Sequence, residues 1–407
     1  MESIKSLVKW IICSLVIGIV VGFVGSCFHH ILEEVTHIRQ DNPWLVYLLP
    51  ITGVIIVFFY RNIGKTANKG TNLIISAIQS GERVPLRMAP LIIIGTSLTH
   101  LFGGSAGREG AALQIGGSLG NFFAKIVKYD EKDTKIAIMC GMSACFSALF
   151  GTPIAAAIFS MEVVSVGIMH YAAIVPCVIA ALIASGIAKM TGLSGTSFDI
   201  GEIPALDPVL GCKMLLVAIL FAFASILLCK VLHKTAHMFS TYLPGEYLRI
   251  IVSGIMIIIL YLGFGTTDYL GAGTHIIEQS FVEQSIWYAF LLKMLFTAIT
   301  LGGGFKGGEI VPTLFVGATL GSFLAPIFGL PIALCAACGM VSVFCGVTNC
   351  PLTSLILSIE MFGSESMTFC MLCIAVSYLL SGYFSLYHSQ KITYSKYKPE
   401  YIDRNSL

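Results

Sequence analysis

The chain has 407 residues, of which 56% are hydrophobic and only 11% are charged. A soluble domain of this size carries more charge, so lipid must cover much of the surface. Lysine and arginine number 24 against 22 acidic residues, a net charge of +2, which gives no case for nucleic-acid binding.

Apolar segments recur along the whole chain, and several are long enough to cross a bilayer core, which takes roughly 20 helical residues. They cover residues 10–28, 44–60, 91–102, 136–159, 171–188, 214–232, 250–264, 286–300 and, with interruptions, 314–387. Segment 91–102 is too short to cross, and glycine clusters break others, as in helices that enter the membrane only partway. We therefore expect an all-α membrane protein of tilted and partly spanning helices.

The flanking charges predict the orientation. Basic residues cluster near the N-terminus, in a central loop and in the tail: Lys5, Lys9, Lys125, Lys128, Lys132, Lys135, Lys391, Lys396 and Lys398. This bias predicts that both termini face the cytoplasm of a cell membrane. The first apolar segment is followed by no small-residue cleavage site, so we interpret it as a retained helix.

Thirteen cysteines lie mostly inside apolar segments and form no disulfide pattern. Two C-x-x-C pairs, Cys335/Cys338 and Cys370/Cys373, have the spacing of a metal or redox site. Their neighbours include no histidine or charge that would tune a thiolate, so packing between helices explains them better. We expect no metal and no cofactor.

The two halves of the chain resemble each other in a single register. Residues 141–146 (GMSACF) recur at 339–344 (GMVSVF), a shift of 339 − 141 = 198, and the same shift superposes Pro153 on Pro351 and Glu162 on Glu360. Such a duplication favours two membrane repeats with the substrate bound between them. We place the first repeat at residues 1–205, the second at 206–390 and a short cytoplasmic tail at 391–407.

Upstream of each copy lies a glycine-rich segment that ends at a glutamate: residues 103–110 (GGSAGREG) with Glu109, and residues 302–309 (GGGFKGGE) with Glu309. Glycines before a helix let the chain turn tightly and leave the first amide N–H groups free. With the helix dipole, those donors can bind a dehydrated halide without a full countercharge. Two such segments converging from two repeats would surround the ion.

The glutamates add a proton to this chemistry. A carboxylate can occupy the position of the halide, and a low-dielectric site favours its protonation, after which it releases the amides. Proton and halide binding would then be linked through Glu109, which supports exchange of one for the other. The alternative is that both glutamates only cap helices, but a carboxylate inside a membrane is a functional candidate by default. Arg108 and Lys306 could be structural counterions or could attract anions.

Residues 107–110, with the glycine-rich helix after them, resemble the G-R-E-G motif of the CLC chloride channel and transporter family. Residues 304–312 (GFKGGEIVP) resemble the second anion-site motif of that family, and the resemblance extends from the first helix to Tyr387. It implies the CLC inverted-repeat fold and a homodimer with a separate pathway in each subunit. It also implies that Glu109 is the external gate, that Gly107, Arg108, Ile310 and Val311 belong to the anion site, and that the Tyr387 hydroxyl touches the anion. Without the resemblance, Tyr387 would be interpreted as an interfacial residue.

Three departures separate the chain from chloride-type members. Where chloride exchangers carry G-S-G-I-P, this chain has Asn68 and Lys69 followed by the candidate anion-binding residues Gly70, Thr71 and Asn72, without a serine. Where they carry two glutamates, the second of which relays protons, it has Glu162 and Val163. Glu309 stands where chloride-type members have no acid. Together the departures resemble the fluoride-exporting branch, although a threonine associated with that branch is Val311 here.

Fluoride is small and a strong hydrogen-bond acceptor, so a site rich in donors and protonatable groups suits it. Lys69 could draw anions inward or simply reach the interface. The chain ends about twenty residues after Tyr387, so we expect no cytoplasmic nucleotide-binding domain.

The leading hypothesis is a proton-coupled fluoride exporter whose partners are the halide, protons and the bilayer. The second is a chloride/proton antiporter or passive chloride channel on the same frame. A third, an intramembrane enzyme, finds little support, because the nine histidines include no H-E-x-x-H motif.

Overall fold

A computed structural model of the chain describes residues 2–64 and 69–407, so Asn68 lies outside the described residues. The first half contains α1 (Glu2–Asp41), η1 (Pro43–Leu48), α2 (Leu49–Ile63), α3 (Thr71–Ser80), α4 (Met88–Leu101), α5 (Glu109–Val127), α6 (Glu131–Phe150), α7 (Pro153–Glu162), η3 (Tyr171–Ala173) and α8 (Ile174–Met190). The second half contains α9 (Pro208–Tyr242), α10 (Glu246–Phe264), α11 (Thr274–Gln279), α12 (Ala289–Gly303), α13 (Ile310–Phe328), α14 (Ile332–Thr348), α15 (Pro351–Phe362), η4 (Ser364–Ser366) and α16 (Met367–Leu380).

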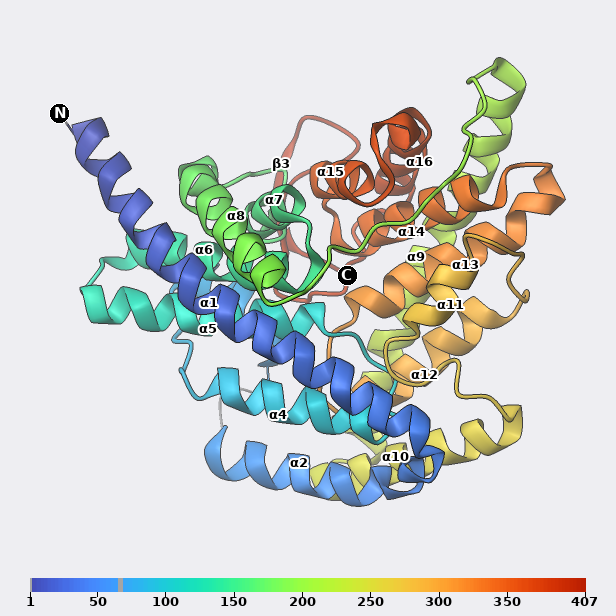
Figure 1. Ribbon diagram of the computed structural model, residues 1–407, viewed down its shortest axis with the longest axis horizontal. Coiled ribbons are helices and arrows are strands. Elements are labelled where there is room, and N and C mark those ends of the chain that lie inside the picture. The colour runs from blue at the N-terminus through green and yellow to red at the C-terminus, as the bar shows by residue number, and fades with distance from the viewer. Residues whose placement is uncertain (1, 65–68) are drawn as a thin grey trace.

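The helices of the second half follow the order of those of the first. Helices α5 and α13 both have 19 residues and both follow a glycine-rich segment. Helices α1 and α9 are the long ones, with 40 and 35 residues. In Figure 1 the blue-to-green first half lies mainly on the left and the orange-to-red second half on the right, while α2 and α10 lie together at the bottom.

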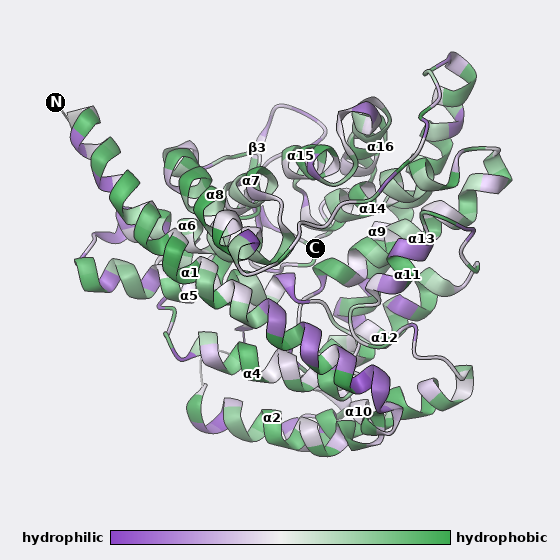
Figure 2. Cartoon of the chain, in the orientation of Figure 1, coloured by the Kyte–Doolittle hydropathy of each residue, from purple (hydrophilic) through white to green (hydrophobic). Residues whose placement is uncertain are grey.

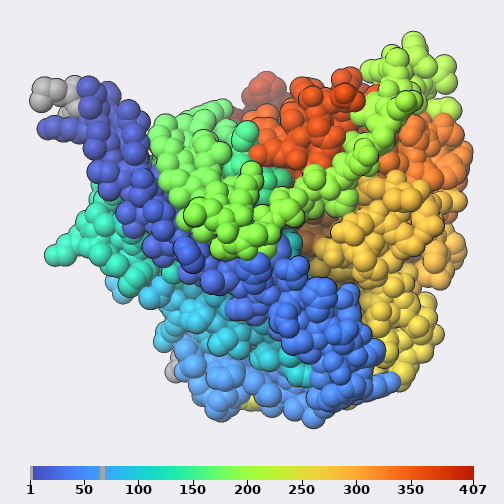
Figure 3. All heavy atoms as spheres, in the orientation of Figure 1, coloured from blue at the N-terminus to red at the C-terminus, as the bar shows by residue number. Residues whose placement is uncertain are grey.

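The linker between the halves has no helix from residue 191 to 207 and contains the predicted boundary at 205/206. Figure 3 shows this lime-green segment crossing the face of the molecule from one half to the other.

Glycines bring the paired helices of each half into close contact. A Cβ at Gly116 of α5 would overlap with the carbonyl oxygen of Gly141 in α6, and Gly317 of α13 stands in the same relation to Gly339 of α14. Small residues allow this approach between membrane helices. The same close packing of two helices therefore occurs in both copies of the internal repeat.

Two predicted segments differ from the structure. Segment 136–159, predicted as one apolar run, forms two helices, because α6 ends at Gly151 with φ +74° and α7 begins at Pro153. Glycine adopts this left-handed conformation without strain, and proline is favoured in the first turn of a helix. Segment 10–28 is only the apolar middle of α1, which continues to Asp41. Figure 2 shows the change from green to purple along α1.

In the part of the chain that the structure describes, seven helical segments are long and apolar enough to cross a membrane: residues 3–41, 43–63, 131–150, 171–190, 208–242, 246–264 and 310–328. Others, including α4, α7 and α12, have only 10 to 17 residues, as expected for segment 91–102. Many large apolar side chains on α1, α9 and α10 are exposed. The chain is therefore a multi-pass membrane protein of spanning and partly spanning helices.

A small sheet, which the sequence analysis did not anticipate, joins the two halves. Strand β1 (Ser165–Val166) follows α7 and pairs in parallel with β2 (Lys391–Tyr394). Strand β2 pairs in antiparallel orientation with β3 (Tyr401–Asn405). The tail at 391–407 is thus a hairpin attached to the membrane domain.

Candidate functional site

The two glycine-rich segments meet inside the protein. Gly107 donates its N–H to the Gly308 carbonyl at 2.7 Å, and Gly308 donates to the Gly107 carbonyl at 2.8 Å. This pair lies directly before α5 and α13, so two helix N-termini are held together at one point. Such termini are suited to anion binding.

Glu109 begins α5 and is fully buried. Its Oε2 accepts the N–H of Arg108 at 3.1 Å. Its Oε1 lies 3.5 Å from Nε of Arg108 and has no hydrogen-bond partner. The carboxylate therefore lies against the main-chain donors of its own helix terminus, with one oxygen left for another partner.

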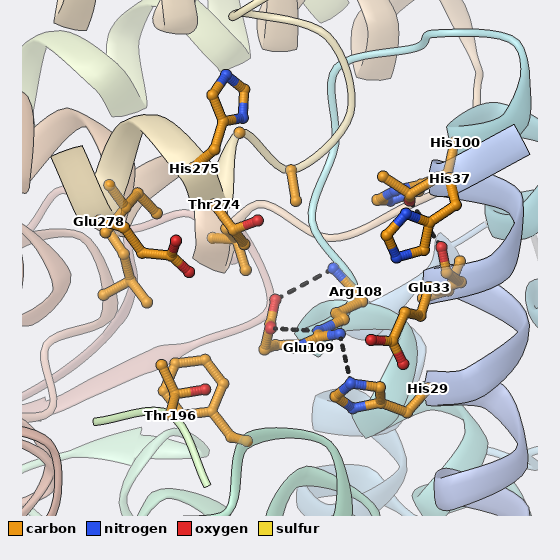
Figure 4. A pocket seen from close by; sticks show the side chains of 18 of the residues that line it. His29, Glu33, His37, His100, Arg108, Glu109, Thr196, Thr274, His275 and Glu278 are labelled. Carbon is orange, nitrogen blue, oxygen red and sulfur yellow. Dashed lines mark hydrogen bonds and ion pairs between the residues drawn. The ribbon is translucent and has the colours of Figure 1, made fainter. Parts of the chain in front are cut away.

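Arg108 connects Glu109 to α1. Its Nη1 lies 3.2 Å from Nε2 of His29, and Figure 4 shows the guanidinium between the imidazole and the Glu109 carboxylate. Because arginine can only donate, His29 must accept through Nε2, so the other ring nitrogen carries the proton. Arg108 is thus fixed from both sides.

A cavity of about 320 Å³ opens at this point, and we call it the Glu109 cavity. Its titratable lining residues are His29, Glu33, His37, Arg39, His100, Arg108, Glu109, His275 and Glu278. Thr196 and Phe198 of the inter-half linker also line it. Val311, in the first turn of α13, is the predicted anion-site residue that α13 contributes to this cavity.

A second cavity, of about 410 Å³, contains Glu309, and we call it the Glu309 cavity. It is lined by Gly70, Thr71, Asn72, Gln114, Lys306 and Tyr387, among other residues. Oε2 of Glu309 and the Tyr387 hydroxyl are both buried, and neither has a hydrogen-bond partner among the residues that the structure describes. Buried polar atoms usually have hydrogen-bond partners, so two unpaired polar atoms in one cavity indicate that the cavity binds a polar ligand.

Gly110 lies between the two glutamates. A Cβ added there would lie 2.9 Å from Cα of Gly308, 3.3 Å from Oε2 of Glu309 and 3.6 Å from Oγ1 of Thr71. The absence of a side chain at Gly110 therefore lets the Glu309 carboxylate approach the N-terminus of α5.

A third helix N-terminus reaches the Glu309 cavity. Helix α3 begins at Thr71 after Gly70, whose φ of +59° favours glycine. Oγ1 of Thr71 lies 3.4 Å from the Gly110 carbonyl oxygen and 3.4 Å from Nε2 of Gln114. The side-chain oxygen of Asn72 bonds to another part of the chain: it accepts a hydrogen bond from the N–H of Ser389 at 3.0 Å.

The structure therefore divides the predicted site residues between two connected regions. Gly107 and Ile310 lie at the junction, Arg108, Glu109 and Val311 at the Glu109 cavity, and the rest at the Glu309 cavity. The sequence left open whether Lys69 and Lys306 attract anions. In the structure Lys69 pairs with Glu82 at 2.5 Å. The ammonium of Lys306 lies 4.3 Å from the centre of the Tyr60 ring.

Sequence reasoning missed three residues near the site. Gln114 follows Gly110 by one helical turn, and that spacing was the signal available. The sequence gives no indication of a partner for His29, which in the structure bonds to Arg108. Lys293 of α12 is fully buried and donates to the carbonyls of Tyr269 at 3.3 Å and Gly271 at 2.7 Å.

Comparisons with known proteins agree with this architecture. Residues 52–382 match the voltage gated chloride channel family. A chloride/fluoride channel protein of Pseudomonas syringae pv. tomato is 35% identical over 98% of this chain and 89% of its own length. The crystal structure of a CLC-type fluoride/proton antiporter is 35% identical, has a TM-score of 0.91, and is matched over 94% of this chain and 98% of its own.

A slow cyanobacterial chloride/proton antiporter, 19% identical, shares the fold with a TM-score of 0.79 and is matched over 92% of this chain and 94% of its own. The fold predicted from the sequence is confirmed. Because the family match covers most of the chain, this protein belongs to the CLC family of membrane ion channels and transporters.

Proposed function

We propose that this protein is a fluoride exporter that moves fluoride outward in exchange for protons moving inward. One observation carries the proposal: two carboxylates, Glu109 and Glu309, lie on either side of the joined helix termini at Gly107 and Gly308. Each carboxylate has a buried oxygen without a hydrogen-bond partner. An ion pathway that passes both carboxylates would contain two groups that can bind and release protons.

Glu109 would act as the gate. While ionised it holds the Arg108 amide, which is a donor that a halide would also use. Protonation removes the charge that binds it there, so the side chain can leave and an anion can take its position. Proton binding and anion binding then alternate at one set of main-chain donors.

Glu309 and Tyr387 would make the site selective for fluoride. A protonated carboxyl and a phenol each offer an O–H donor, and their oxygens lie unpaired in one cavity. Fluoride accepts hydrogen bonds more strongly than chloride and loses a tighter hydration shell on entering. Replacing that shell with strong donors therefore lowers the cost of entry for fluoride more than for chloride.

The 35% identity to a solved fluoride/proton antiporter supports this assignment. The similar Pseudomonas protein is described as a chloride/fluoride channel, which keeps chloride transport or uncoupled flux as the second candidate. In either case the protein moves ions, and we propose no enzymatic step.

The test is transport by the purified protein in liposomes loaded with equal fluoride and chloride, with electrodes following each anion and the pH. We expect fluoride to leave faster than chloride and protons to enter as it leaves. Equal or faster chloride release would overturn the fluoride selectivity. In a second condition the fluoride gradient is the only driving force for protons. Anion release without proton entry in that condition would favour the channel.

We further propose a cell-membrane location with both termini in the cytoplasm, so the Glu109 cavity is external and the Glu309 cavity internal. We also propose a homodimer with one pathway per subunit, which is consistent with both cavities lying within one chain. Labelling of single cysteines introduced at Lys398 and Glu202 by an impermeant reagent in intact cells tests the orientation. Cross-linking in membranes tests the dimer.

A further inference from the structure

Tyr387 lies in a non-helical segment between the end of α16 at Leu380 and strand β2 at Lys391. Its side chain is 1% exposed, and within the described ranges 2–64 and 69–407 its hydroxyl has no hydrogen-bond partner. A large aromatic side chain on a segment without regular structure needs its backbone fixed from outside. The surroundings of residues 383–390 show how this is done.

The membrane helices hold one side of the segment. Ser389 donates its N–H to Oδ1 of Asn72 at 3.0 Å, and its carbonyl accepts Nε2 of Gln79 at 2.8 Å. Nε2 of Gln390 donates to the carbonyls of Val163 at 2.9 Å and Thr348 at 2.7 Å. These bonds attach residues 389 and 390 to α3 and to the ends of α7 and α14.

The tail hairpin holds the other side. The Ser406 hydroxyl donates to the carbonyl of Tyr387 at 2.7 Å, and its N–H donates to the carbonyl of Gln390 at 3.0 Å. The next residue, Leu407, donates its N–H to the carbonyl of Tyr383 at 2.8 Å. The guanidinium of Arg404 lies 3.9 Å from the centre of the Tyr383 ring. The hairpin therefore contacts both ends of the segment that carries Tyr387.

Both backbone groups of Tyr387 are bonded to serine hydroxyls. Its N–H donates to Oγ of Ser385 at 3.1 Å, and its carbonyl accepts from the Ser406 hydroxyl and also from the N–H of Gln390 at 3.0 Å. Strand β2 is also paired with β1, so the hairpin is anchored to the first half of the chain through Ser165 and Val166. The phenol is thus left free while its backbone is fixed.

We propose that the hairpin at 391–407 is a clamp that sets the position of the Tyr387 hydroxyl in the Glu309 cavity, and that Ser406 is the positioning residue. The role in transport rests on the proposed function, because it requires that the phenol meets the anion. A tail expected only as a short cytoplasmic segment thereby becomes part of the internal end of the pathway.

Two sets of measurements test the clamp, and the first concerns flux. Ser406→Ala lowers the fluoride flux about fivefold, the size expected for one lost hydrogen bond, whereas Ser406→Thr keeps the hydroxyl and retains most of the flux. Tyr387→Phe lowers the flux by removing the phenol itself. The double variant is no slower than Tyr387→Phe alone, because Ser406 acts only through that hydroxyl. The control is Ser240→Ala, whose exposed hydroxyl bonds only within α9.

The second measurement is hydrogen exchange by mass spectrometry, which does not depend on transport. Ser406→Ala speeds amide exchange in residues 383–390, and Ser240→Ala does not. The clamp is overturned if amide exchange in Ser406→Ala is the same as in the wild type. It is also overturned if that variant keeps the wild-type flux, or if the double variant loses flux by the product of the two single losses. If the wild-type protein moves no anion, the proposed function fails, and the exchange experiment still decides the clamp.

Discussion

The carboxylate of Glu162, at the end of α7, accepts two hydrogen bonds from Thr353 in the first turn of α15, one from its N–H at 2.9 Å and one from its hydroxyl at 2.6 Å. It also accepts the N–H of Leu352 at 3.1 Å. The repeat-related Glu360, at the end of α15, accepts the N–H groups of Ile154 at 3.0 Å and Ala155 at 2.8 Å in the first turn of α7. Each helix thus caps the other across the internal repeat.

This arrangement predicts that Glu162→Ala destabilises the protein more than Glu360→Ala. The first change leaves the N–H and hydroxyl of a buried threonine without an acceptor, at about 1–3 kcal/mol for each unsatisfied group. The second leaves the N–H groups of Ile154 and Ala155 without an acceptor at the more exposed terminus of α7, where fewer buried groups are affected. Thermal unfolding in detergent measures both, with the exposed Glu202→Ala as the control. Equal unfolding temperatures for wild type and Glu162→Ala would contradict the capping role.

Glu162 stands next to Val163, the position where chloride exchangers carry a proton-relaying glutamate. Val163 is buried, and its carbonyl is bonded to Gln390. The sequence, through its resemblance to the family, therefore predicts that the relay carboxylate is missing here. It could not reveal that the neighbouring carboxylate is committed to α15, because the bonded residues are about 190 positions apart.

Replacement of the proposed gate should separate the two ion flows. Glu109→Gln keeps the size of the side chain but cannot bind and release a proton, so we expect fluoride flux to persist while coupled proton entry disappears. Wild-type flux should rise as the pH falls, since protonation releases the carboxylate from the Arg108 amide. The flux of the variant should depend less on pH, with Glu309 as the remaining carboxyl of the pathway.

Parallel fluoride and pH electrodes on the same liposomes measure both flows. The control is Glu365→Gln, an exposed glutamate in η4. Proton entry that continues in Glu109→Gln at the wild-type ratio would remove Glu109 from the coupling mechanism.

Selectivity should depend on the second carboxyl. Glu309→Ala removes one strong donor from the cavity that also contains the Tyr387 hydroxyl. A hydrogen bond to a charged partner contributes roughly 1.5–3 kcal/mol, so the ratio of fluoride to chloride flux should fall about tenfold or more. Competition between the two anions in one liposome preparation measures this ratio. A ratio unchanged from wild type would assign selectivity to other groups.

The sequence sufficed for the repeat, the partly spanning helices and the two glutamates, because glycine, proline and glutamate mark helix ends locally. It did not suffice for contacts that only the tertiary structure creates. Lys293 lies in an ordinary apolar segment, and nothing nearby in the sequence indicates that its ammonium meets the carbonyls of Tyr269 and Gly271. The bond between His29 and Arg108 and the tail hairpin around Tyr387 are long-range in the same way.

Lys293→Met tests the structural importance of that buried ammonium. Methionine fills much of the same space, but it cannot donate to the two loop carbonyls, which should lower the free energy of unfolding by about 1–3 kcal/mol for each carbonyl left unpaired. Thermal unfolding measures the loss, and Lys189→Met, an exposed lysine of α8, is the control. If the variant unfolds at the wild-type temperature, the carbonyls have found other donors.

The narrowest part of the site offers the most specific steric test. In Gly110→Ala the added methyl lies 2.9 Å from Cα of Gly308 and 3.3 Å from Oε2 of Glu309, so it separates the joined helix termini and displaces the carboxylate. Overpacking of this kind costs about 1–3 kcal/mol, and if that cost falls on the ion-bound state, flux drops about 5- to 150-fold. Gly186→Ala is the matched control, because a methyl there meets nothing within 4 Å. Gel filtration must show both variants folded, so that lost flux reports on the pathway. Fluoride flux at the wild-type rate in a folded Gly110→Ala protein would mean that the ion does not pass the joined helix termini at Gly308, and that pathway would have to be abandoned.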